Sequence, residues 1–201
     1  MSTELQDALE RLNIIHDQVA RGELYRGYRS WSVGASGVCS LLAAALQPTT
    51  VDSPSRFVLY WCVVAALCGM IAASEIVLNY LLHENPHNRR ISRRVVGQFV
   101  PCLAAGAAVT LALMRLGGNS PTLLPGLWAI LFGLGIFSSR PYLPRSVGYI
   151  ALGYLLAGTW LLLSAGTLPL AAAKWNVGAT FGIGQLAAAL VLYWNLEREH
   201  A

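Results

Sequence analysis

The stretch His83-Glu84-Asn85-Pro86-His87 matches the pattern HExxH, in which two histidines on one helix bind zinc and the glutamate acts as a general base. Two features weigh against that chemistry here. Pro86 disfavours a helical backbone at Asn85, so the two histidines would not lie one helical turn apart. A catalytic zinc also needs a third protein ligand, and the remaining histidines, His16 and His200, lie in the terminal segments. We therefore expect neither a bound metal nor an enzyme activity.

Glu75 is the one acidic residue inside a long apolar stretch. It precedes Leu82 by seven residues, about 10 Å along a helix. In a membrane-spanning helix, a charge at that depth should face the protein interior or a wet cavity. Asn79 and His83 follow at four and eight residues, on the same helical face. Together with Gln98 of the next apolar stretch, they form a candidate polar site that contacts protons or cations, or that only makes structural hydrogen bonds.

The four cysteines all lie inside apolar stretches, at Cys39, Cys62, Cys68 and Cys102. None forms a CxxC pair or has the spacing of a zinc site, so we expect them to pack as small buried hydrophobic residues. The apolar stretches contain no glycine-rich phosphate loop and no pair of histidines suited to haem. The sequence therefore predicts no cofactor.

The composition is that of a membrane protein. Hydrophobic residues make up 55% of the chain and charged residues 12%, against about 25% charged residues in soluble proteins. The apolar residues are gathered in long runs, which favours transmembrane helices. We expect an all-α, polytopic membrane protein, a bundle of six transmembrane helices at residues 30–46, 56–82, 95–116, 122–138, 146–165 and 170–194.

The charges between these runs predict a topology. Residues 83–96 are expected to form a loop that carries Arg89, Arg90, Arg93 and Arg94, and such a loop stays on the cytoplasmic side of a membrane. When loops are assigned alternately, the outer side holds three cations, Arg56, Arg115 and Lys174. The inner side holds eleven: Arg11, Arg21, Arg26, Arg29, Arg89, Arg90, Arg93, Arg94, Arg140, Arg145 and Arg198. Both termini are therefore expected in the cytoplasm. Because the arginines flank apolar runs and do not form one basic face, the net charge of +4 does not indicate a nucleic-acid partner.

Residues 3–21 have the pattern of an amphipathic helix. Its apolar positions recur at steps of three or four, at Leu5, Leu9, Leu12, Ile15 and Val19. Up to residue 29, five acids stand against four arginines, whereas helices that lie on anionic lipid are normally basic. We therefore expect this helix to pack against the cytoplasmic face of the protein or against a partner helix. The domains are then 1–29, a cytoplasmic helix and linker; 30–195, the transmembrane bundle; and 196–201, a cytoplasmic tail.

Small residues at four-residue spacing predict where helices pack closely. The candidate ridges are Ser36 with Ser40, the set Ala65, Gly69 and Ala73, Ala104 with Ala108, the set Gly126, Ala129 and Gly133, and the GxxxG pair Gly178 and Gly182. The tryptophans mostly lie near span ends, as interface anchors do. Gln98, Thr110, Asn176 and Gln185 either line a polar path or make hydrogen bonds between helices.

Three stretches together resemble a family of small six-span bacterial inner-membrane proteins without an assigned activity. They are the arginine and aromatic residues before Ser36-Gly37; Ser92-Arg93-Arg94 running into Pro101 and Gly106; and the final set Gly148, Gly153, Trp175, Gly178, Gly182 and Tyr193. The resemblance implies a fold and a location in the bacterial inner membrane.

Two function classes remain open. One is a structural or regulatory subunit that docks a partner at its cytoplasmic face. The other is a small oligomeric transporter or channel, with Glu75 lining a polar cavity. Transporters normally contain internal repeats with broken helices in matching positions, and the three helical hairpins show no convincing repeat. The sequence therefore favours the subunit, with the lipid bilayer and a cytoplasmic protein as partners.

Overall fold

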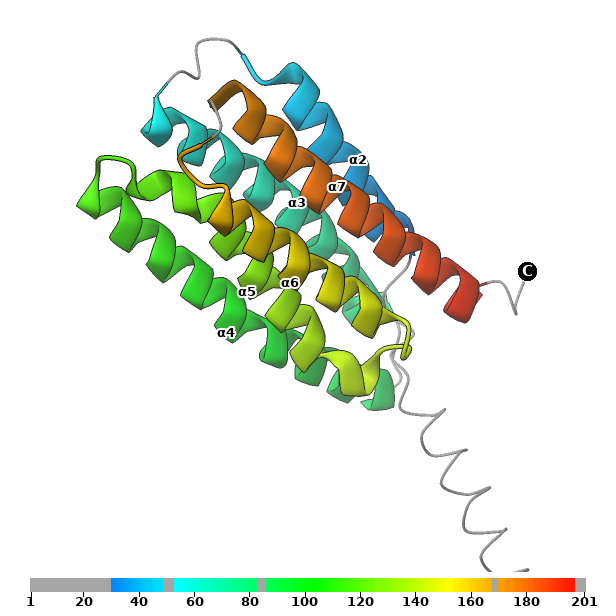
Figure 1. Cartoon of the computed structure of the whole chain (residues 1–201). Helices are drawn as coiled ribbons and strands as arrows, with labels where there is room; N and C mark the ends of the chain where they lie inside the picture. Colours follow the sequence, from blue (N-terminus) through cyan, green and yellow to red (C-terminus); the bar gives the residue numbers. More distant parts are fainter. Residues whose placement is uncertain (1–29, 49–52, 83–85, 168–169, 198–201) are drawn as a thin grey trace, which may run out of the picture.

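The computed structural model describes residues 30–48, 53–82, 86–167 and 170–197. Within these residues the chain forms a bundle of α-helices joined by short connections (Figure 1). The six helices are α2 (Ser30–Leu46), α3 (Pro54–Leu82), α4 (Pro86–Leu116), α5 (Leu124–Ser138), α6 (Val147–Leu163) and α7 (Leu170–Leu192). Short 3-10 turns at Ser120–Leu123 and Arg140–Tyr142 connect α4 to α5 and α5 to α6, and a π-helical turn, Tyr193–Glu197, follows α7.

Helix length and hydropathy identify a multi-pass membrane protein. Four segments within the described residues are long and apolar enough to cross a membrane: Pro54–Glu75, Arg93–Leu116, Ser120–Ser138 and Ala173–Asn195. The apolar helices α2 and α6 are shorter, at 17 residues each, a length at the lower end of what spans a bilayer core. The predicted all-α membrane fold is confirmed at this level.

The structure corrects the predicted loop at residues 83–96. α3 ends at Leu82 and α4 already begins at Pro86, so the four arginines lie in the first turns of α4 instead of in a loop. The physical reason is that proline suits the first position of a helix, where its missing N–H has no partner to lose. Arginine is also a good helix former. The helix therefore begins nine residues before residue 95, whereas the segment that is long and apolar enough to cross a membrane, Arg93–Leu116, begins within two residues of the predicted start of the third span.

Two helix pairs pack most closely, α2 against α7 and α5 against α6. In the first pair, a Cβ added to Gly182 would meet Leu41 Cγ at 2.5 Å, and one added to Gly37 would meet the Gly182 carbonyl oxygen at 2.9 Å. In the second pair, a Cβ on Gly126 would lie 2.8 Å from the Gly158 carbonyl oxygen. The predicted ridges at Gly178 and Gly182, and at Gly126 and Gly133, are thus confirmed as helix seams.

Other predicted ridges are not seams between the described helices. Ala65, Gly69 and Ala73 are all exposed on α3, and a Cβ added to Gly69 would meet nothing within 4 Å. Ala104 and Ala108 are exposed on α4 in the same way. Small residues permit two helices to approach closely, but they do not determine which helix is the neighbour. In a membrane, a helix face with small residues can also contact lipid.

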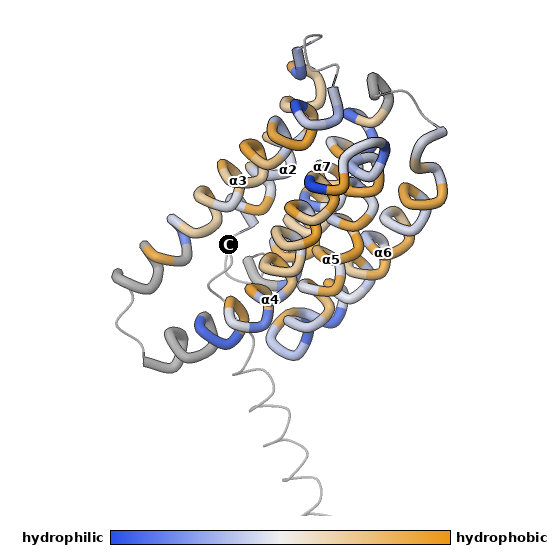
Figure 2. The backbone as a smooth tube through the Cα atoms, turned by 90° about the vertical axis from the view of Figure 1, so that its left-hand side faces the viewer, coloured by the Kyte–Doolittle hydropathy of each residue, from blue (hydrophilic) through white to orange (hydrophobic). Residues whose placement is uncertain are grey.

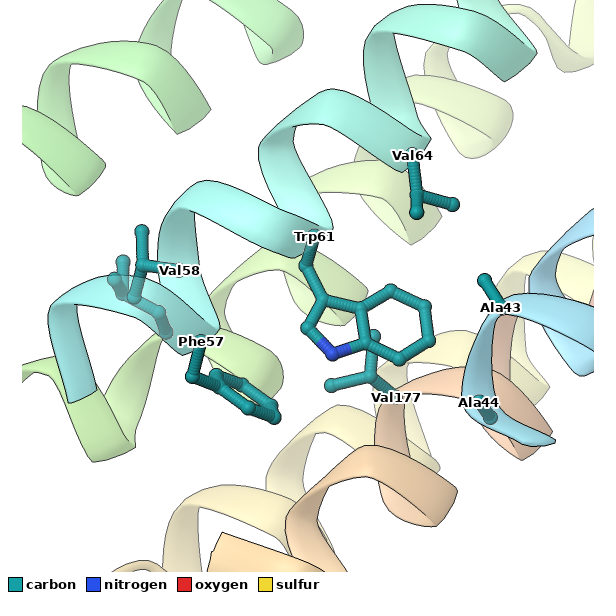
Figure 3. Close-up of a cluster of buried hydrophobic side chains, with 8 residues drawn as sticks. Ala43, Ala44, Phe57, Val58, Trp61, Val64 and Val177 are labelled. Carbon is teal, nitrogen blue, oxygen red and sulfur yellow. The ribbon is translucent and has the colours of Figure 1, made fainter. Parts of the chain in front are cut away.

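One buried cluster joins the end of α2 to the starts of α3 and α7 around Trp61 (Figure 3). Trp61 is 4% exposed, and its indole N–H donates a hydrogen bond to Gln47 Oε1 at 3.1 Å. Trp128 is also partly buried, and its N–H donates to Thr110 Oγ1 at 2.9 Å. These two tryptophans are core residues, so their prediction as interface anchors was wrong. A tryptophan near a span end can turn either to the interface or to a neighbouring helix, and here each finds a hydrogen-bond acceptor inside.

Candidate functional site

The structure places Glu75 on α3 and Gln98 on α4, both partly buried. The Oε1 atom of each residue is shielded from solvent and has no hydrogen-bond partner, so these two atoms do not bond to a shared donor. Asn79 belongs to α3, but the structure describes its backbone only, and His83 lies outside the described residues. Of the four predicted site residues, the structure therefore locates two acceptor side chains.

Both orphaned atoms are hydrogen-bond acceptors. An amide oxygen accepts hydrogen bonds only, and an ionised carboxylate can do nothing else. Leaving a buried acceptor unpaired costs about 1–3 kcal/mol, and more when it is charged. Each oxygen atom could therefore be paired with a water molecule, a cation, or an N–H group from another part of the protein.

Aromatic rings fill the middle of the bundle. Phe132 of α5 lies 5.2 Å from the ring of Phe99, 5.1 Å from that of Tyr154 and 5.6 Å from that of Phe181, between ring centroids. These partners come from α4, α6 and α7. The Tyr154 hydroxyl donates to the Phe181 carbonyl oxygen at 3.4 Å. The cluster therefore joins α4, α5, α6 and α7 through contacts between aromatic rings.

A small cavity lies at the opposite end of the bundle from the α3–α4 turn. Its volume is about 50 Å³, and its walls come from the starts of α3, α5 and α7 and the end of α6, including Phe57, Pro125, Leu161 and Asn176. Pockets for small molecules measure about 300–1,000 Å³. This cavity has room for a few water molecules only, beside the Asn176 side chain. It does not include any residue of the predicted site.

The remaining polar groups mostly satisfy one another. Thr110 accepts from Trp128, as predicted for a hydrogen bond between helices. The Cys68 thiol donates to the Ser36 carbonyl oxygen at 3.8 Å. In the described part of the chain, no group of three or more His, Cys, Asp or Glu side chains could hold a metal ion. The HExxH stretch lies mainly outside that part, and α4 begins at Pro86, inside the motif.

Four of the six exposed arginines in the described residues lie at one end of the bundle, and Arg56 and Arg115 lie at the other. Arg93 and Arg94 near the start of α4, and Arg140 and Arg145 between α5 and α6, are all exposed. Figure 2 shows hydrophilic stretches at the lower end of the bundle, where α4 begins. The Arg140 guanidinium lies 5.7 Å from the centre of the Phe137 ring, a cation–π distance. This end is suited to acidic partners.

No protein-family model, curated protein or solved structure matches the chain at a significant level. The resemblance based on residues 36–37, 92–106 and 148–193 therefore stays a prediction. Sequence reasoning also missed one relation inside the candidate site. Cys68 and Glu75 are seven residues apart, which puts them on one helical face, and the Cys68 contact with Ser36 turns that face toward α2. The seven-residue spacing of Cys68 and Glu75 in the sequence could have indicated that they share a helical face.

Proposed function

We propose that the protein is a non-enzymatic structural or regulatory subunit of a bacterial inner membrane, which docks a protein partner at its cytoplasmic face. All six helices cross the membrane, and both termini lie in the cytoplasm. The observation that carries the proposal is the difference between the contacts among the helices and the charged residues at one end of the bundle. Rings and glycine seams join the helices, whereas four of the six exposed arginines of the described residues, Arg93, Arg94, Arg140 and Arg145, lie at one end. Binding is then expected at the ends of the bundle and not within it.

The proposed topology predicts which positions are reachable from outside the cell. Single cysteines at Ser53, Ser120 and Thr167 should be labelled by a membrane-impermeant thiol reagent, because they lie at the ends of helices assigned to the external side. A cysteine at Asn88 should be labelled only after the membrane is opened. Labelling is read in intact cells and in permeabilised cells, with the unmodified protein as control. If the Asn88→Cys variant is labelled in intact cells, the proposed topology is wrong.

The proposed docking helix predicts the effect of a deletion. Removing residues 2–21 should leave membrane insertion and the bundle intact but release a soluble partner, because the apolar stripe from Leu5 to Val19 is lost. The measurement is purification from native membranes in mild detergent, with all co-purifying proteins identified for the full chain and for the deletion. The control variant Glu4→Gln keeps the whole segment and its apolar stripe and removes one negative charge. If the deleted chain fails to insert, residues 2–21 belong to the fold.

A small oligomeric transporter is the second candidate, and one observation favours it. The unpaired oxygens of Glu75 and Gln98 lie on adjacent helices of the chain, and acceptor oxygens are what a cation or a proton path requires. The same purification separates the two functions. A stoichiometric partner that is lost from the deletion supports the subunit, and a homo-oligomer without a partner supports transport.

A further inference from the structure

The Cys68 thiol of α3 lies against one turn of α2. It donates a hydrogen bond to the Ser36 carbonyl oxygen at 3.8 Å. In an α-helix, a carbonyl oxygen points along the axis toward the residues three and four positions later, which here are Cys39 and Ser40. The side chains of both residues also interact with the Cys68 thiol. A second thiol therefore lies beside the first, on the neighbouring helix.

The backbones of α2 and α3 approach each other at this level. A cysteine side chain is short, so a thiol that contacts the backbone of another helix requires the two helices to lie close together. Ser36 and Ser40 are small and buried. Two turns further along α2, the Tyr60 hydroxyl donates to the Ala43 carbonyl oxygen at 2.7 Å. A disulfide needs Cα atoms about 4.4–6.8 Å apart, and small residues between two helices permit such an approach.

The other two cysteines lie elsewhere. Cys62 precedes Cys68 by six residues, which turns it about 120° away around α3, and it is exposed. Cys102 belongs to α4. Neither lies on the face of α3 that contacts α2, so both serve as references for the reactivity of the pair.

A covalent bond at Cys68 would join two helices that pack less closely than α2 and α7 do. α3 continues beyond Cys68 to Leu82, and most of the positions described in that second half are exposed. Few contacts therefore hold the second half of α3 in place. A bond from Cys68 to α2 would fix where this half, which carries Glu75, begins.

We propose that Cys39 and Cys68 form a reversible intramolecular disulfide under oxidising conditions, and that this bond holds α3 on α2. With hydrogen peroxide as the oxidant, one thiol becomes a sulfenic acid and one water molecule is released. The second thiol attacks that sulfur, and a second water molecule leaves as the S–S bond forms. Two S–H bonds and one O–O bond are thus replaced by one S–S bond and two O–H bonds. A dithiol reductant restores both thiols.

Identification of the linked peptides tests the pair in purified, full-length protein in mild detergent. The protein is treated with hydrogen peroxide, unfolded, alkylated and digested with trypsin. Two of the four thiols should be lost to a link that joins the Cys39 peptide to the Cys68 peptide, and dithiothreitol should restore both. The surroundings are apolar, and the thiolate is the reactive form. We therefore expect a slow reaction, and the identity of the product is the readout.

Three single substitutions identify the partners of the bond. Cys39→Ser and Cys68→Ser should each abolish the linked peptide, whereas Cys62→Ser should leave it unchanged. The same treatment is repeated with copper-phenanthroline as a second oxidant. Absence of the link under both oxidants would overturn the proposal, and so would a link that survives Cys68→Ser but is lost from Cys62→Ser.

Hydrogen exchange measures whether the bond holds α3. Backbone amides of α3 beyond Cys68 should exchange more slowly in the oxidised protein than in the reduced protein, because local opening of this half is restrained. Cys39→Ser should show no difference between the two conditions. If the link forms but exchange in α3 is unchanged, the bond does not restrain the helix and that part of the proposal is wrong. Since no partner or membrane orientation enters these measurements, they are independent of the proposed function and topology.

Discussion

Replacing Tyr154 with alanine is expected to destabilise the protein by about 3 kcal/mol, the largest effect of a single truncation in the bundle. Tyr154 is 2% exposed, and its ring packs against Phe132 at 5.1 Å and Phe181 at 5.6 Å between centroids. A Cβ on Gly184 of α7 would already collide with this ring, so the helices are shaped around it. Removing the ring leaves a cavity whose walls lose their contacts, and lipid cannot enter to replace them. The measurement is the free energy of unfolding in mixed micelles, by titration with a denaturing detergent.

The control for this experiment is on the same helix. Tyr149 is 78% exposed, so Tyr149→Ala should change the free energy of unfolding by less than about 0.5 kcal/mol. Tyr154→Phe separates the ring from the hydroxyl. Because the hydroxyl bond to Phe181 is long, at 3.4 Å, this variant should lose less than about 1 kcal/mol. Equal losses for Tyr149→Ala and Tyr154→Ala would mean that the aromatic cluster does not hold the helices together.

Adding one methyl group at Gly158 is expected to cost about 1–3 kcal/mol. A Cβ there would lie 2.8 Å from the Gly126 carbonyl oxygen and 2.9 Å from the Ile130 nitrogen. Both are backbone atoms, so α5 and α6 would have to move apart, whereas a side chain could rotate away. The thermal midpoint and the free energy of unfolding of Gly158→Ala should both fall below those of the wild type.

Gly153 supplies the matched control, again on α6. A Cβ at Gly153 would meet nothing within 4 Å, and alanine is the better helix former by roughly 0.5–1 kcal/mol. Gly153→Ala should therefore leave stability unchanged or raise it slightly. If the two variants unfold alike, the close contact of Gly158 with α5 does not contribute to stability.

The sequence predicted the fold well where length and hydropathy decide. The helix predicted at 30–46 is α2 to the residue, and the one predicted at 146–165 is α6 within two residues at each end. The prediction failed where a charged stretch continues a helix, at the start of α4. There the arginines were interpreted as a loop because charge indicates the membrane boundary, although the helix continues beyond it.

Helix neighbours were harder to predict than helices. The spans are apolar on all sides, so no stripe of polar residues indicates which face is buried. Gly69 and Gly182 both belong to small-residue ridges. A Cβ added to Gly182 would contact Leu41, whereas one added to Gly69 would meet nothing within 4 Å. The candidate site was predicted as a set of residues on one helical face, and the structure places Glu75 on α3, while its depth in a membrane stays a prediction. Its relation to α2 required the observed contacts of Cys68 and Trp61.

The close pairing of α2 with α7 has a consequence for biosynthesis. α2 ends at Leu46 and α7 begins at Leu170. The glycine seam between them can therefore form only after α7 has been synthesised. At roughly 5–20 residues per second, the ribosome needs on the order of ten seconds to make the intervening chain. During that time the α2 face around Gly37 is open to lipid, to the insertion machinery or to membrane proteases. Closure of the seam therefore reports that α7 has been synthesised, and chains cut short before α7 lack it.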